Sequence, residues 1–165
     1  MFGKHFLHQW ARVGALTFLL TCMVTFTFLL NTAHAGPRVR CRSIGGLLLD
    51  EHVEGDVAVA KMIGEITGSY TYTLKDSFPA DAALTNLIYV TGTSVVETNG
   101  GTLSFFETST QDTSERGNLN GTVLMTITGS TGKWEGATGH IVLVGFFHQD
   151  TLTGAWSYVS KVCVP

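Results

Sequence analysis

One glycine-rich corner dominates the sequence: Gly129-Ser130-Thr131-Gly132-Lys133-Trp134-Glu135-Gly136-Ala137-Thr138-Gly139. Four glycines in eleven residues do not suit the interior of a helix or strand, because glycine instead permits positive φ and close backbone approach. Polar and apolar residues alternate before the corner, at 120–128, and after it Ile141, Leu143 and Phe147 share one face of a second run. This pattern predicts two strands joined by a tight corner, with Trp134 folded back over the bare backbone.

Strand-like segments fill the chain before this corner. Residues 67–75 alternate, and 87–96 form a β-branched run with a bend expected at Gly92. Asn99-Gly100-Gly101 is a hairpin signal that leads into a return strand at 102–108. With 155–162 as a last strand, we count seven or eight strands and no helix, which indicates a sandwich or a barrel. A barrel is favoured because closure removes exposed strand edges.

Other segments are less regular. Residues 43–49 are apolar with a glycine pair, which suggests a strand with a bend. Residues 57–63 fit a strand or a short helix, since periodicity cannot separate the two over so short a run. Turns or loops are expected at 50–56, 78–83, 111–118 and 148–154.

The first 35 residues have the pattern of a signal peptide. Lys4 and Arg12 precede a long apolar stretch, residues 13–30, and Ala33-His34-Ala35 places small residues where signal peptidase reads them. We expect cleavage after Ala35 and export of a single domain, residues 36–165. An uncleaved signal anchor is the alternative, because about eighteen apolar residues can just span a bilayer.

The charge of the expected mature domain excludes one class of partner. It carries eight Lys and Arg against thirteen Asp and Glu, a formal charge of −5. Nucleic-acid binding normally requires a basic face. We therefore expect no nucleic-acid partner.

Two cysteines remain after cleavage, Cys41 and Cys163. In an exported chain an even pair predicts a disulfide, here between the first segment and the last strand. A catalytic cysteine is the alternative, although neither residue has a histidine beside it in sequence.

The corner residues resemble a known family. The pattern Gly129-x-Thr131-Gly132-x-Trp134-Glu135-Gly136-x-x-Gly139-x-Ile141-x-Leu143 is similar to the glycine-rich corner of allene oxide cyclases, and dirigent proteins carry a looser form. The resemblance implies a single eight-stranded antiparallel β-barrel, calycin-like, that needs no metal or organic cofactor. It also implies structural roles for Gly132, Trp134, Glu135, Gly136 and Gly139, with Glu135 bonding backbone amides of the turn.

One departure from the family concerns its chemistry. Its acidic, amide-bearing motif on the first barrel strand has no counterpart near residues 57–72, where Glu65 stands alone. The resemblance therefore implies the fold and a hydrophobic small-molecule ligand rather than allene oxide cyclisation itself.

Glu107 is the candidate catalytic residue, because it shares strand parity with Leu103 and Phe105. An inward carboxyl group would have a raised pKa and act as an acid or base; at a strand end it would instead sit in water. Six aromatic residues are candidates to line a ligand pocket, although ordinary barrel packing also requires such residues. They are Tyr70, Tyr72, Tyr89, Phe105, Trp156 and Tyr158.

No histidine or cysteine spacing indicates a metal site. His140 and His148 lie eight residues apart on one expected strand, or about 26 Å at the rise of a strand. The apolar run 141–147 has both faces hydrophobic, which suits a homo-oligomer contact or cover by the N-terminal segment. Three functions follow: an exported barrel that binds a hydrophobic molecule, a cofactor-free cyclase or isomerase, and a structural barrel with a filled core.

Overall fold

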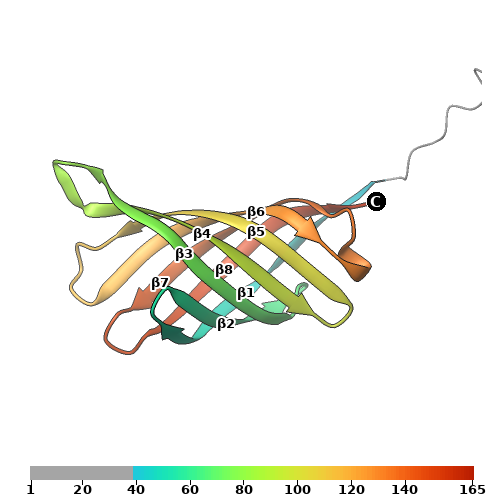
Figure 1. Ribbon diagram of the computed structural model, residues 1–165, viewed down its shortest axis with the longest axis horizontal. Coiled ribbons are helices and arrows are strands. Elements are labelled where there is room, and N and C mark those ends of the chain that lie inside the picture. Colours follow the sequence, from blue (N-terminus) through green and yellow to red (C-terminus); the bar gives the residue numbers. More distant parts are fainter. Residues whose placement is uncertain (1–38) are drawn as a thin grey trace, which may run out of the picture. The chain divides into compact units, whose positions relative to one another are not determined.

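The computed structural model describes residues 39–165, which form one unit built almost wholly of strands. The predicted signal peptide, residues 1–35, therefore lies outside the described residues. Eight strands follow one another in chain order (Figure 1). They are β1 (Arg40–Glu54), β2 (Val57–Gly64), β3 (Gly68–Asp81), β4 (Leu84–Thr98), β5 (Gly101–Asp112), β6 (Asn118–Ser130), β7 (Thr138–His148) and β8 (Thr153–Val164).

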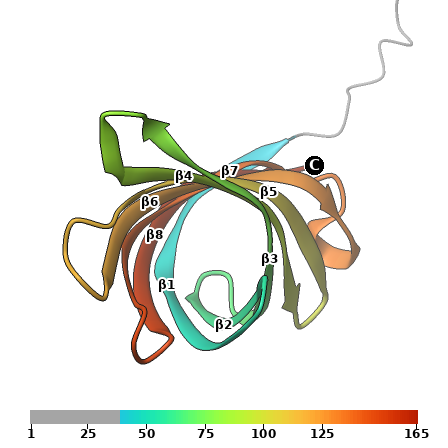
Figure 2. The same cartoon turned by 60° about the vertical axis from the view of Figure 1, so that its left-hand side comes forward.

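Every strand pairs antiparallel with its neighbours in sequence, and β1 pairs with β8. The ladder is thus a closed barrel, and its strands curve round into a ring (Figure 2). The prediction of an all-β antiparallel fold is confirmed. An eight-stranded ring has an interior that side chains fill, or that holds one small ligand.

Side-chain alternation places one face of each strand inside. On β5, Leu103, Phe105 and Glu107 are buried, whereas Phe106 between them is 44% exposed. β7 repeats the pattern, because Ile141 and Leu143 are buried whereas Val142 between them is only half-buried and Val144 is exposed. The period of two predicted from the sequence is therefore the period that builds the core.

Several segment boundaries differ from the sequence expectation. Residues 57–63, where a strand and a short helix were both open, lie in a strand, β2. By contrast, β3 continues through the expected turn at 78–83 as far as Asp81. The expected loop at 111–118 shortens to residues 113–117. In each case pairing with a neighbouring strand extends the element beyond its local sequence preference.

The glycine-rich corner is a short 3-10 turn, η1 (Gly132–Trp134), that docks on the β4–β5 hairpin. Gly132 has φ of 62°, and a Cβ there would lie 2.1 Å from the carbonyl oxygen of Gly100. Trp134 is 3% exposed, and its indole Nε1 donates to Oγ1 of Thr98 at 2.9 Å. The corner thus closes one end of the barrel with a buried indole.

The disulfide predicted between Cys41 and Cys163 is present. The two residues are register partners on β1 and β8, so the bond crosses the seam where the ring closes. The sulfur atoms are therefore not free thiols, and the alternative of a catalytic cysteine is wrong. Within residues 39–165 no helix is long and apolar enough to cross a membrane.

Large side chains fill one half of the barrel. This half lies at the end with the corner and the β2–β3 and β4–β5 connections (Figure 1). Its fully buried residues include Met62, Ile66, Leu103, Tyr158 and Val162. The opposite half, under the remaining hairpins, is not filled in this way.

Candidate functional site

A cavity of about 290 Å³ occupies the unfilled half of the barrel. Its lining includes residues of the β1–β2 turn, such as Gly55 and Asp56, so the mouth lies at that end. The walls are mainly apolar, with Leu48, Val90 and Leu143 among them. An apolar cavity with a few convergent polar groups is the usual form of a small-molecule site.

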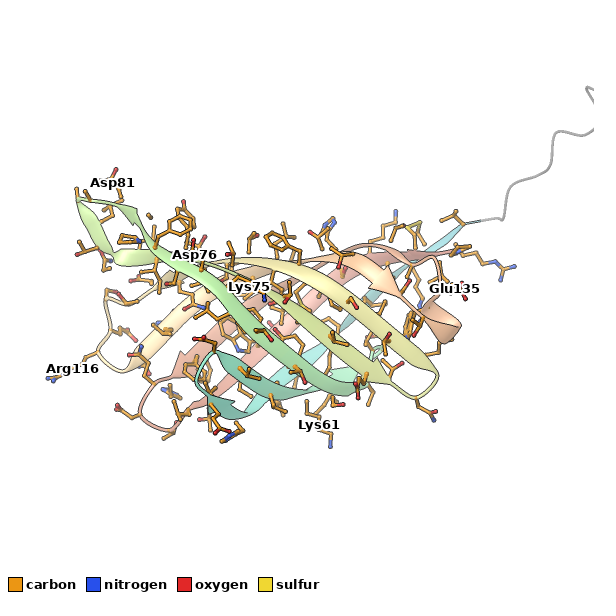
Figure 3. All side chains as sticks on the ribbon, in the orientation of Figure 1. Lys61, Lys75, Asp76, Asp81, Arg116 and Glu135 are labelled. Atoms are coloured by element: carbon orange, nitrogen blue, oxygen red, sulfur yellow. A yellow bond between two sulfur atoms is a disulfide. The ribbon has the colours of Figure 1, made fainter. Side chains whose placement is uncertain are left out.

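Charged side chains mostly stay outside this interior. Lys61, Asp81, Arg116 and Glu135 are exposed and project from the outer surface or from loops (Figure 3). The buried carboxyl group of Glu107, only 3% exposed, is therefore an exception that needs a physical explanation.

Glu107 lies where the cavity meets the filled core. It is paired with Gly92 on β4 and with Met125 on β6. The Tyr70 hydroxyl donates to Oε1 at 2.9 Å and lies 3.0 Å from Oε2, and the Ser94 hydroxyl also donates to Oε1. These two hydroxyls, from β3 and β4, hold the carboxyl group in place.

Burial raises the pKa of Glu107 from 4.5 to about 7, because desolvation disfavours the charged form. The hydrogen bonds from Ser94 and Tyr70 oppose this rise, and the nearby Asp50 carboxyl group adds to it. The pKa of the Tyr70 phenol is raised well above 10, first by burial and then by Glu107. Glu107 can therefore give up or accept a proton near neutral pH, whereas Tyr70 stays protonated.

Gly92 makes room for the aromatic wall beside Glu107. A Cβ at Gly92 would lie 2.3 Å from a carbon of the Tyr72 ring, so only glycine leaves space for the ring there. Tyr72 is half-buried and lines the cavity. The glycine expected to bend β4 thus has a steric role at the site.

A second carboxyl group of the cavity lining, that of Asp50, is half-buried. The indole Nε1 of Trp156 on β8 donates to Oδ2 of Asp50 on β1 at 3.0 Å. Burial raises the pKa of Asp50, and the bond from Trp156 partly offsets that rise. Both residues line the cavity.

The cavity brings together four of the residues predicted from the sequence: Glu107, Tyr70, Tyr72 and Trp156. Phe105 and Tyr158 are buried but lie outside the lining. The Tyr158 hydroxyl bonds the backbone of Ile66, which places it in the filled half. The assignment of Phe105 and Tyr158 as lining residues is therefore wrong.

The prediction that Tyr89 lines the cavity is also wrong. It is 41% exposed, and its ring packs against Phe78 on the outer surface with centroids 5.9 Å apart. At the start of the run 87–96, odd- and even-numbered residues are both apolar. The sequence pattern therefore did not reveal which face points inward. The buried residues Val90, Ser94 and Val96 set that parity.

Ser94 and Asp50 are functional candidates that the sequence prediction missed. Ser94 shares parity with Val96, a signal that could have placed it inside. Asp50 fell within an expected acidic turn, but β1 continues to Glu54 and bulges between Asp50 and His52. Such an extension depends on pairing with β2 and leaves no local signal.

The corner residues agree in part with their predicted structural role. Trp134 is buried, and three of the glycines have positive φ: Gly132, Gly136 and Gly139. Glu135 is a correction, because its side chain is exposed and makes no hydrogen bond among the described residues. Its backbone N–H alone takes part in the turn, donating to Gly132. Sequence spacing does not reveal in which direction such a side chain points.

No cluster of three or more His, Cys, Asp or Glu side chains suited to a metal lies within residues 39–165. His140 is exposed, whereas His148 bonds Asn118 and packs against Phe146. The site therefore consists of one buried and one half-buried carboxyl group, Glu107 and Asp50, with their hydroxyl and indole donors and aromatic walls.

Comparison of the chain with protein-family models, curated proteins and solved structures found no match.

Proposed function

We propose that this protein is an exported β-barrel that binds one small hydrophobic molecule in its cavity. The observation that carries the proposal is an apolar cavity of about 290 Å³ with a buried carboxyl group, Glu107, at its floor. This volume is close to the lower end of the range for ligand sites, roughly 300–1,000 Å³. Burial of an apolar ligand contributes roughly 25 cal/mol for each Å² removed from water.

The resemblance of the corner to allene oxide cyclases and dirigent proteins supports the same proposal. Proteins of this kind hold a flexible apolar molecule in one shape inside a calycin-like barrel. The buried Trp134 and the positive-φ glycines fit a corner of that type. A completely filled, purely structural barrel is disfavoured by the cavity.

Export is the second part of the proposal. Residues 1–35 would act as a signal peptide cleaved after Ala35, which releases the domain 36–165. The Cys41–Cys163 disulfide supports this, since such bonds persist mainly in oxidising compartments.

Binding is tested with N-phenyl-1-naphthylamine, a neutral probe that fluoresces in apolar surroundings. Val123 lines the cavity, whereas its neighbour Leu124 is 40% exposed on the outer face. We expect Val123→Trp to weaken probe binding at least tenfold by filling the cavity, and Leu124→Trp to leave it unchanged. Absence of binding to the wild type, or equal loss in both variants, would contradict the proposal.

A cofactor-free isomerase or cyclase is the second candidate function. It is favoured by Glu107, whose pKa of about 7 suits a general acid or base at neutral pH. The cavity would template the substrate and lower the entropic part of the barrier.

This activity is tested on the molecule that copurifies with the protein from its host. Abstraction of a C–H proton by Glu107 predicts deuterium uptake by that molecule in D₂O, measured by mass spectrometry. Glu107→Gln should abolish the uptake without loss of the fold, and Glu97→Gln, on the exposed face of β4, should retain it. Equal uptake with Glu107→Gln would refute the catalytic role.

We further propose that the barrel forms a homo-oligomer through an outer apolar surface. Val142 is paired with Leu124 on one side and with Val159 on the other, and Val159 is 70% exposed. Exposed contiguous apolar surface often marks a protein contact. Light scattering should give a multiple of the monomer mass for the wild type and the monomer mass for Val159→Lys.

A further inference from the structure

The ionisable side chains that line the cavity are all acids. Among the described residues, the lining holds the carboxyl groups of Asp50, Asp56 and Glu107 and the phenols of Tyr70 and Tyr72, with no lysine, arginine or histidine. An anionic ligand would meet like charges and no cationic partner. The charge of the lining therefore favours a neutral or cationic head group.

The hydrogen-bond donors beside Glu107 and Asp50 already donate to these two carboxyl groups. The hydroxyls of Tyr70 and Ser94 donate to Glu107, and the indole of Trp156 donates to Asp50. An ionised carboxylate offers about four sites that accept hydrogen bonds. The donors just named do not occupy all of these sites on Glu107 or Asp50. A ligand group that supplies donors therefore fits better than one that needs them.

The walls suit a cation with an apolar body. Tyr72, Phe147 and Trp156 line the cavity, and the faces of such rings attract cations. Leu48 and Leu143 supply apolar surface in the same lining. Aromatic faces and a carboxylate together are the usual surroundings of an organic ammonium group.

We propose that the molecule held in the cavity is a lipophilic amine, whose protonated amino group donates to Glu107 while its apolar body packs against the walls. This inference rests on the proposed function and names its ligand class. Asp50 strengthens the negative potential that the ammonium group meets. A hydrophobic carboxylic acid of the same shape is rejected by that potential.

Binding of an amine should depend on pH through Glu107. The groups that face it are Tyr70 and Tyr72 on β3, Ser94 on β4 and Asp50 on β1. Burial raises the pKa of both phenols, so they stay neutral. With the pKa of Glu107 at about 7, its charged fraction rises about tenfold from pH 6 to pH 8, where an alkylamine stays protonated. Amine affinity should rise by about the same factor.

The test uses three probes with one naphthalene body and different head groups: 2-(1-naphthyl)ethylamine, 2-(1-naphthyl)ethanol and 1-naphthylacetate. Titration calorimetry at pH 6 and pH 8 gives their affinities. At pH 8 we expect the amine to bind about tenfold tighter than the alcohol, and the acetate to bind weakest. Glu107→Gln should bring the amine to the affinity of the alcohol and change the alcohol less than threefold, while Glu97→Gln should change neither.

The outcomes separate this inference from the proposed function. Equal binding of amine and alcohol by the wild type, or tightest binding of the acetate, would refute the amine as the ligand class. The proposed binding of a hydrophobic molecule in the cavity would still hold. Failure of all three probes and of N-phenyl-1-naphthylamine would overturn both. If Glu107→Gln does not fold, the tenfold pH effect on the wild type and a loss of amine affinity in Asp50→Asn decide the question.

Discussion

Glu107 should make the folded protein less stable as the pH rises. Replacing it with glutamine should remove this pH dependence. The pKa of Glu107 rises from 4.5 to about 7 on folding, because the side chain is buried. The folded protein therefore holds this proton more tightly than the unfolded chain. The resulting stabilisation is fully present below about pH 4.5 and is lost as the pH rises through about 7.

The size of the effect follows from the pKa shift. A rise from 4.5 to about 7 corresponds to about 3 kcal/mol, of which about 2 to 3 kcal/mol falls between pH 5 and pH 8. Other carboxyl groups also contribute, since burial raises the pKa of Asp50 and hydrogen bonds lower those of Glu65 and Asp112. The quantity to compare is therefore the difference in free energy of unfolding between wild type and variant.

Urea denaturation followed by tryptophan fluorescence measures that difference, with points from pH 5 to pH 8. We expect the free energy of unfolding of the wild type, minus that of Glu107→Gln, to fall by about 2 to 3 kcal/mol from pH 5 to pH 8. Glu97→Gln, on the exposed face of β4, is the matched control and should leave the wild-type profile unchanged. Parallel profiles for wild type and Glu107→Gln would refute the assignment of a desolvated carboxyl group.

Three further predictions concern the fold. Reduction of the Cys41–Cys163 disulfide, which closes a span of 122 residues, should cost about 5 kcal/mol in the chain-entropy model, measured as a lower denaturation midpoint. Gly92→Ala should destabilise by about 1–3 kcal/mol through its clash with the Tyr72 ring, and Tyr72→Leu in the same chain should restore most of the loss. Met62→Ala, at a fully buried position, should cost about 2–5 kcal/mol in urea denaturation; a cost below 1 kcal/mol would contradict a tightly filled half.

The parts of the fold that were predictable from sequence are those with a local physical signature. Alternation along β5 placed Glu107 on the same face as Leu103. The glycines of the corner predicted a turn between β6 and β7. The cysteine pair indicated which strands meet at the seam. These features depend on side-chain period, backbone freedom and covalent chemistry, all of which can be read from neighbouring residues.

The rest depends on contacts between distant residues. Tyr89 lies in a run with apolar residues at both parities, so only pairing with β3 and β5 fixes it on the outside. Asp50 enters the site because β1 runs past its acidic residues while paired with β2. The unfilled half of the barrel likewise results from the sum of side-chain volumes on eight strands, which no single segment reveals.

The position of the disulfide has a mechanical consequence. Cys41 lies at the start of the first strand and Cys163 at the end of the last, so a pulling force applied to the N- and C-terminal sides of the domain passes directly between the two sulfur atoms. The hydrogen-bonded ladder and the cavity between these points carry almost none of that load. In single-molecule stretching, the span between the two cysteines should therefore not extend in the oxidised protein, and a reductant should release these 122 residues.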